Sequence, residues 1–207
     1  SWEADFEPLP PATDAVPPFT GIDHVALAVP AWQMDGAVLF WRGLFGLQPR
    51  AAVDLADPRG LVRSRAMVGP GGGLRLPINV SEDAATSTGR FLNAFSGGGV
   101  HHVAFGTGDA AAATAGMPLL DLPANYHDDL DARFGLDDAA LARLRRGRLL
   151  YDRDNEGGEF VHAYMPAYAH RFFFEVVERR GGYAGFGEGN AIVRLAAQAR
   201  LEARSGG

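Results

Sequence analysis

The sequence predicts an α+β fold in which two βαβββ modules form one curved mixed sheet with helices on its outside. The main observation is a repeat, since residues 21–27 (GIDHVAL) recur as residues 99–105 (GVHHVAF). Each copy alternates or runs apolar over the length of a strand and is followed by a turn and a helical pattern. Strand-like runs separated by turn residues come next. The order strand, helix and several strands therefore occurs twice.

The remaining elements follow from the spacing of apolar residues. A helix is expected over 37–45, ending at Gly46, and a short alanine-rich helix over 110–115. Two hairpins are expected, which pair 61–68 with 74–80 and 159–165 with 172–178. Residues 125–146 are polar with a helical pattern. Residues 191–204 have one apolar face, so they predict an amphipathic helix that lies on an apolar surface.

The domain organisation is expected to be a linker followed by a single domain. Residues 7–18 hold five of the 13 prolines, which makes residues 1–20 an extended, proline-rich linker. Such a start favours a piece cut from a longer polypeptide with a preceding domain. The single domain covers 21–207, with module one over about 21–97, module two over about 98–183 and a C-terminal helix over about 188–204.

Composition excludes several classes of protein. The chain has 207 residues, 25 Asp and Glu against 19 Lys and Arg, and no cysteine. Disulfide scaffolds, zinc fingers, iron–sulfur clusters and thiol nucleophiles are thereby excluded. Apolar stretches fall far short of the roughly 20 residues that span a bilayer, and residues 1–5 are unlike a signal peptide. We expect a soluble, cytoplasmic protein that binds a small-molecule substrate without a membrane or nucleic-acid partner. The sequence does not decide whether the chain forms a homo-oligomer.

The repeated strands predict a metal site. Side chains alternate along a strand, so His24 shares a face with small alanines while the bulky aliphatic residues point the other way. His102 holds the equivalent position in the second copy, and Glu175 lies among apolar residues of the last strand, where a carboxylate needs a partner. Two histidines and one carboxylate are typical of non-haem Fe(II) oxygenases. Taken singly, each residue also fits a structural role in the core or at a sheet edge.

A third histidine is expected beside this site. If the second hairpin turns near 166–171, His162 lies directly across from Glu175, and Tyr164 lies across from Phe173. His162 is then a candidate catalytic residue that moves a proton as a general acid or base. It could equally support a metal ligand, or simply pair with the acid.

At these residues the sequence resembles the C-terminal half of the 4-hydroxyphenylpyruvate dioxygenase family, within the vicinal oxygen chelate superfamily. The resemblance implies Fe(II) held by His24, His102 and Glu175, and substrate contacts from Ser64, Asn79 and Asn190, to which we add Tyr164. It runs from about residue 21 to 204 and rests on the segments 22–25, 76–79, 99–104, 151–154, 174–177 and 185–190. The family usually has glutamine where this chain has Ser87 and His162, and phenylalanine where it has Ala191.

Residues 179–183 and 190–200 are also similar to the dioxygenase-like C-terminal domain of bacterial fusion proteins. In those proteins an N-terminal barrel dehydrates 3-dehydroshikimate. The leading hypothesis is a dioxygenase acting on an aromatic 2-oxo acid or related chelating substrate with Fe(II) and O₂, although Mn, Co, Ni, Mg or Zn also suit the ligands. The alternatives are a ligand-binding or accessory domain of a fused dehydratase, and a metal-assisted isomerase or lyase of glyoxalase type.

Overall fold

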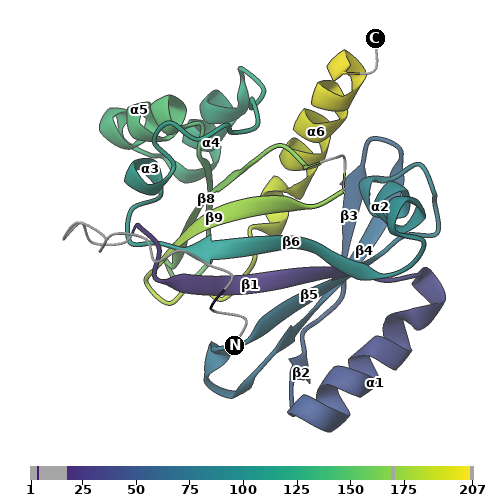
Figure 1. Cartoon of the computed structure of the whole chain (residues 1–207). Coiled ribbons are helices and arrows are strands. Elements are labelled where there is room, and N and C mark those ends of the chain that lie inside the picture. The colour runs from purple at the N-terminus through teal and green to yellow at the C-terminus, as the bar shows by residue number, and fades with distance from the viewer. Residues whose placement is uncertain (1–3, 5–17, 169–170, 206–207) are drawn as a thin grey trace.

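The computed structural model describes residue 4 and residues 18–168 and 171–205, which form one strongly curved nine-stranded sheet with helices packed against it (Figure 1). This confirms the predicted fold class. The strand order is β2-β4-β5-β1-β6-β9-β8-β7, and β3 also pairs with β4. The linker expected over 1–20 lies mostly outside the described residues. The strands are β1 (Gly21–Ala28), β2 (Gln48–Pro49), β3 (Val53–Asp57), β4 (Gly60–Val68), β5 (Arg75–Val80), β6 (Gly99–Gly106), β7 (Leu150–Arg153), β8 (Glu159–Tyr164) and β9 (Phe173–Arg180).

The two repeated strands, β1 and β6, form the centre of the sheet. They pair antiparallel from Gly21↔Gly106 to Ala28↔Gly99. The last strand of each module then adds in parallel on the outer side, β5 beside β1 and β9 beside β6. Each of these carries its hairpin partner, β4 or β8, farther out. The sequence repeat is thus a repeat of structure, with β1 and β6 meeting at a pseudo-twofold axis.

Helices on the outer face of the sheet determine which side chains point inward. Helix α1 (Met34–Phe45) packs Val38 against a cluster that includes Val25 and Val29 of the first module. Because neighbouring residues of a strand face opposite ways, His24 points to the inner face. The second module is covered in the same way by α3 (Ala110–Ala113), α4 (Tyr126–Phe134) and α5 (Asp138–Gly147), and α2 (Ser87–Phe95) packs on β6.

The register of the second hairpin differs from the expected one by two residues. His162 lies opposite Val177, and Tyr164 lies opposite Glu175. Pairing continues past β8 to a bridge between Tyr168 and Phe172, so the turn lies nearer to β9 than we expected. The prediction that His162 stands directly across from Glu175 is therefore wrong. A shift of two residues keeps every side chain on its face, so His162 still reaches Glu175 diagonally.

Two further elements differ in detail from the expected ones. The helical pattern over 125–146 is two helices, separated where Gly135 adopts a left-handed conformation (φ 59°) and Asp137 caps α5 through the Ala140 N–H. Helix α6 (Ala191–Ser205) is the expected amphipathic C-terminal helix. It packs Ala197 into the core of the second module and contacts β3 of the first, so it links the two modules.

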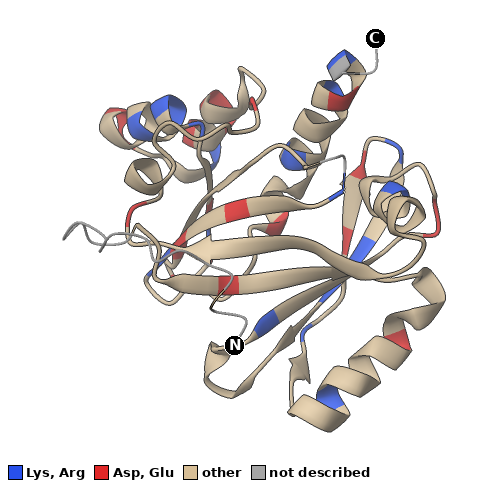
Figure 2. Cartoon of the chain, viewed as in Figure 1, with Lys and Arg blue, Asp and Glu red and all other residues tan. Residues whose placement is uncertain are grey.

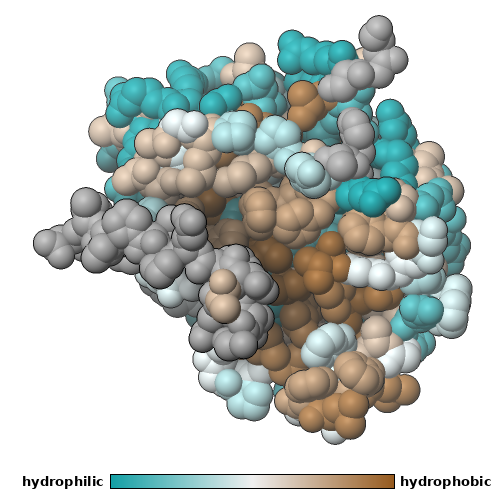
Figure 3. Space-filling model, in the orientation of Figure 1, coloured by the Kyte–Doolittle hydropathy of each residue, from teal (hydrophilic) through white to brown (hydrophobic). Residues whose placement is uncertain are grey.

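Acidic and basic residues are interspersed over the helices and strands in the view of Figure 2. Apolar side chains gather over the uncovered part of the central strands and over α1 (Figure 3). Those of α1 include Leu39 and Leu44, which are 68% and 71% exposed. No helix in the described part of the chain combines the length and apolar character needed to cross a bilayer.

We predict that Gly89→Ala in α2 destabilises the protein, although alanine usually favours a helix. A Cβ atom at Gly89 would lie 2.3 Å from the Asp83 carbonyl oxygen and 2.7 Å from the Ala84 Cα, and both are backbone atoms that cannot move aside cheaply. We expect a loss of about 1–3 kcal/mol in urea unfolding. The control is Gly43→Ala in α1, where nothing lies within 4 Å and a gain of up to about 1 kcal/mol is expected. Equal effects of the two substitutions would contradict this packing argument.

Candidate metal centre and cavity

Three buried side chains from three neighbouring strands converge on the inner face of the sheet. His24 comes from β1, His102 from β6 and Glu175 from β9. The Nε2 atoms of the two histidines lie 3.3 Å apart. Glu175 Oε2 lies 3.2 Å from His24 Nε2 and 3.4 Å from His102 Nε2. The three residues are 3%, 7% and 1% exposed. The antiparallel β1–β6 pair and the parallel β6–β9 pair bring these residues together across the axis of the repeat.

The two oxygens of Glu175 have different surroundings. Oε1 accepts a hydrogen bond of 2.8 Å from His162 Nδ1. Oε2 is buried and has no hydrogen-bond partner among the described residues. A buried acceptor without a partner is costly, and this one is directed at two imidazole nitrogens. Two imidazoles and a carboxylate are a donor set that divalent transition metals prefer, and the three ligand atoms lie within 4.8 Å of one another. The residues present therefore fit a metal ion.

The two histidines of the site differ in pKa. Burial lowers the pKa of His102 to about 4, in spite of the Glu175 carboxylate beside it. Burial opposes the charged form of His24 as well, but the carboxylates of Asp23 and Glu175 outweigh it and raise the pKa of His24. Glu175 itself is buried, yet its three histidine neighbours hold the pKa of the carboxyl well below its usual range. Glu175 is thus an anion at neutral pH and His102 is neutral.

His24 is oriented by a residue that the sequence analysis did not single out. Its Nδ1 lies 2.7 Å from Asp23 Oδ1, and Arg179 binds the same carboxylate through two contacts of 2.7 and 2.9 Å. Consecutive residues of a regular strand point to opposite faces, but the β1–β6 register shifts at Asp23, between Ile22 and His24. Such a bulge turns a side chain in a new direction. Asp23 can then reach the imidazole that follows it.

Arg179 also holds the loop over the site. Its Nη1 donates to the carbonyl oxygens of Tyr183 and Gly185, at 3.2 and 2.6 Å. The same loop carries Phe186, whose ring packs edge-on against the His24 imidazole with centroids 5.3 Å apart. One guanidinium therefore fixes both the partner of His24 and the loop beside it.

His162 lies behind Glu175 with both ring nitrogens engaged. Asn190 Nδ2 lies 2.9 Å from the Tyr151 carbonyl oxygen, which can only accept, so this atom is the amide nitrogen. It also lies 3.1 Å from His162 Nε2, which must then be the unprotonated nitrogen. The proton of a neutral His162 sits on Nδ1 and is donated to Glu175. Tyr126 donates its hydroxyl to Asn190 Oδ1 at 2.9 Å and completes the chain.

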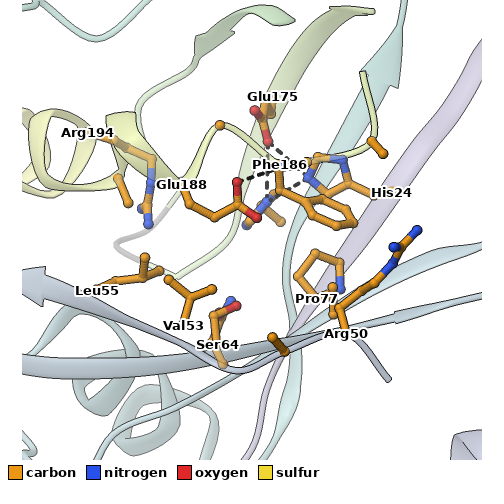
Figure 4. Close-up of a pocket in the computed structure, with 18 of the residues that line it drawn as sticks. His24, Arg50, Val53, Leu55, Ser64, Pro77, Glu175, Phe186, Glu188 and Arg194 are labelled. Carbon is orange, nitrogen blue, oxygen red and sulfur yellow. Dashed lines mark hydrogen bonds and ion pairs between the residues drawn. The ribbon is translucent and has the colours of Figure 1, made fainter. Parts of the chain in front are cut away.

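A cavity of about 450 Å³ opens in front of the three converging side chains. Ser64, Asn79 and Tyr164, which we expected to bind substrate, line it, whereas Asn190 and His162 lie behind Glu175 instead. Figure 4 shows Glu175 and His24 on one side of the cavity and Val53, Leu55, Ser64 and Pro77 on the other. Burial and the charge of Glu175 raise the pKa of Tyr164 well above its ordinary value, so its hydroxyl stays a donor.

Several cavity residues were not found by sequence reasoning. Arg50 lies at the exposed rim, and Phe186, Glu188 and Arg194 line the cavity beside the expected residues. Glu188 Oε2 accepts from the backbone N–H of Phe186 at 3.1 Å. The sequence signal was the glycine-rich run 185–190, which places Phe186 and Glu188 in a loop. Nothing in the helical pattern of α6 distinguishes Arg194 from its other arginines.

Comparisons with known proteins identify relatives of this domain. A model of the Glyoxalase/Bleomycin resistance protein/Dioxygenase superfamily matches residues 21–117. A 3-dehydroshikimate dehydratase of Pseudomonas putida is 50% identical over 190 residues, which are 89% of this chain and 30% of that relative. A 4-hydroxyphenylpyruvate dioxygenase of Pseudomonas aeruginosa is 29% identical over 197 residues, which are 91% of this chain and 55% of that relative.

A solved structure has a similar fold. A fusion protein of a xylose isomerase-like TIM barrel and a 4-hydroxyphenylpyruvate dioxygenase superposes with a TM-score of 0.72 and 45% identity. The match covers 87% of this chain and 29% of that chain. The present chain thus spans less than a third of the dehydratase and of the fusion, and just over half of the dioxygenase.

We predict that Asp23→Asn destabilises the metal-free protein at neutral pH and has little effect in acid. Although burial raises the pKa of the Asp23 carboxyl, hydrogen bonds from His24 and Arg179 lower it well below its ordinary 3.8. A lowered pKa stabilises the fold above that ordinary value and ceases to do so as the pH falls through the folded-state pKa. We expect a loss of about 3 kcal/mol in urea unfolding at pH 7, which narrows as the pH falls below about 4, because the carboxyl of the unfolded wild type then becomes protonated while that of the folded protein stays ionised to lower pH.

The matched control for this prediction is Asp54→Asn. Asp54 makes the same two-contact pair with Arg63, at 2.7 and 3.0 Å, but on the exposed surface, so a much smaller change is expected. A loss at Asp23 that does not depend on pH would show that the carboxylate charge is not what stabilises this part of the site.

Proposed function

The chain carries a vicinal oxygen chelate domain homologous to 4-hydroxyphenylpyruvate dioxygenases and to 3-dehydroshikimate dehydratases, and from this premise we propose that it is a metal-dependent dioxygenase-like domain. In this proposal His24, His102 and Glu175 hold Fe(II), and the cavity binds an aromatic 2-oxo acid or a related chelating substrate. One observation carries it: two imidazole nitrogens converge on a buried carboxylate oxygen that has no hydrogen-bond partner among the described residues.

Iron(II) held by such a triad keeps coordination positions free for a chelating substrate and O₂. The residues of this chain supply the rest. His162 holds Glu175, and Asp23 fixes the ring orientation of His24. Tyr164 presents a protonated hydroxyl to the cavity, and Ser64 and Asn79 add polar groups. Phe186 covers His24 with an apolar ring that excludes water from the ligand.

The three ligands do not determine which divalent metal is bound. Imidazole and carboxylate ligands also accept Mn, Co, Ni, Mg or Zn, and the absence of cysteine removes the ligand that would favour soft metals. The dioxygenase relative and the type of triad together favour iron. Metal analysis of protein purified without added metal tests this choice.

One alternative has a specific observation in its favour. The dehydratase relative is 50% identical, a closer likeness than the dioxygenase relative, and it is more than three times as long as the matched segment. The domain could then bind a chelating ligand, or stabilise a fused N-terminal barrel, without oxidising anything. A metal-assisted isomerase or lyase of glyoxalase type is the other alternative, because the family description spans both chemistries.

The experiment loads the protein with Fe(II) under anaerobic conditions and follows O₂ uptake with a panel of aromatic 2-oxo acids and catechols. We expect uptake that depends on substrate. His24→Ala and Glu175→Ala should bind iron more than about 100-fold more weakly and consume no O₂. The control is His101→Gln on the same strand, because the His101 ring packs edge-on against Phe91 and Phe173 and is not one of the three converging ligands, so this variant should keep the metal.

Other outcomes separate the alternatives. An iron-loaded protein that consumes O₂ with none of these compounds contradicts the dioxygenase proposal. Turnover without O₂ in the presence of Mn, Co or Mg would favour isomerisation. In a longer protein with a fused barrel, dehydratase activity that survives His24→Ala and is lost only on deletion of the whole domain would favour the accessory role.

We predict that His162 acts by positioning Glu175 rather than by moving a proton. Both of its ring nitrogens are engaged and it is 0% exposed. His162→Gln can still donate an amide N–H to Glu175 and should bind metal almost as well, whereas His162→Leu should lose about 10–100-fold in metal affinity. Competition with a chromophoric chelator measures this. If His162→Gln keeps the metal but loses one limb of the pH–rate profile, His162 is the general acid or base instead.

A further inference from the structure

Arg194 of α6 is a buried cation that the proposed function does not use. It is 9% exposed and lines the same cavity as His24, His102 and Glu175. Its guanidinium lies over the rings of Tyr164 and Phe173, 5.3 and 5.5 Å from their centroids. Figure 4 shows it reaching into the cavity from α6, on the side where Glu188 and Leu55 lie. Arg194 is therefore part of the cavity wall.

The charge of Arg194 is not paired with any carboxylate of the described residues. Among the described residues no carboxylate lies within ion-pair distance of it, and its recorded polar partner is the neutral Gln198, to which Nη1 donates at 2.8 Å. Arg179, which is also partly buried, instead binds Asp23. Because a buried guanidinium normally needs an anion beside it, Arg194 lacks the partner that its surroundings call for.

Other charged groups at the cavity do not supply this partner. Glu188 is directed at the backbone N–H of Phe186. Glu175 faces the two histidines and His162. Arg50 adds a second positive charge at the exposed rim. Apart from the metal triad, two arginines therefore face one glutamate, and the cavity favours an anion.

Arg194 is accessible from the cavity and close to the triad. Ala191, three residues earlier on the same face of α6, also lines the cavity and presents only a methyl group. His102 stacks on the Phe173 ring, with centroids 4.7 Å apart, and Arg194 packs against the same ring. One aromatic ring thus contacts both a candidate metal ligand and the guanidinium, and both side chains line the cavity that a compound bound at the triad would occupy.

We propose that Arg194 binds a carboxylate on the substrate, at a different end from the oxygens that chelate the metal. The inference rests on the proposed function, because it assumes a chelated substrate. It narrows the substrate class to ring compounds that carry an ionised carboxylate in addition to the chelating group. Arginine binds carboxylates through paired N–H donors, and the groups of Arg194 that are not bonded to Gln198 remain for this contact.

The test compares two probes that differ in one carboxylate, phenylpyruvate and 4-carboxyphenylpyruvate. Each is titrated anaerobically into Co(II)-loaded protein, and the visible absorption of the cobalt reports chelation and the Kd. We expect the wild type to bind 4-carboxyphenylpyruvate about 10- to 100-fold more tightly than phenylpyruvate. Arg194→Gln should abolish the difference while phenylpyruvate still binds, and Arg194→Lys should keep part of it. Thermal unfolding of each variant checks that it folds.

The control is Arg200→Gln, which removes an exposed charge from the same helix outside this cavity and should keep the discrimination. A further variant, Arg50→Gln, tests the other arginine that lines the cavity. Loss of discrimination in Arg50→Gln but not in Arg194→Gln would overturn the inference, as would equal affinities for the two probes in the wild type. Another result would contradict the proposed function itself. If neither probe changes the cobalt spectrum, the triad does not bind a chelated substrate, and both the function and this inference fail.

Discussion

The carboxylate of Glu175 is the group on which the centre of the molecule depends. It is 1% exposed, and an unpaired carboxylate buried this deeply costs several kcal/mol. Three imidazoles surround it, those of His24, His102 and His162, and Asn190 and two tyrosines hold the third of these in one tautomer. The network engages one carboxylate oxygen and leaves the other facing the two remaining histidines. The polar chain behind the site thus directs the open side of Glu175 at the cavity.

Two arginines near the candidate metal site have opposite electrostatic surroundings. Arg179 is neutralised by Asp23 and ties down the loop that carries Phe186, so it contributes rigidity. Arg194 rests on aromatic rings and donates to the neutral Gln198, and none of the described carboxylates is paired with it. The first arrangement stabilises the folded protein by itself. At Arg194 the aromatic rings and the neutral amide of Gln198 offset part of the free-energy cost of burying the guanidinium, and a bound anion would offset the rest.

Sequence patterns predicted the fold and the convergence of His24, His102 and Glu175, because the repeat and the alternation of side chains along a strand are local signals. They failed where geometry depends on distant pairing. The bulge that turns Asp23 toward His24 is a feature of the β1–β6 register, and the two-residue shift at His162 is a feature of the β8–β9 register. Arg194 was missed because a helical pattern shows which face is apolar but not what that face meets.

The repeat is symmetric in backbone but not in chemistry. Two residues past His102, β6 lies beside Glu175 of β9, whereas β5, which pairs with β1 in the same parallel sense, has Pro77 and Asn79 at the cavity. The duplicated sheet therefore has an anion on one side of its axis and, on the other, a proline ring and a neutral amide. This asymmetry gives the pocket a direction, because a ligand that meets the triad from the β5 side finds a neutral wall on which an uncharged ring can rest.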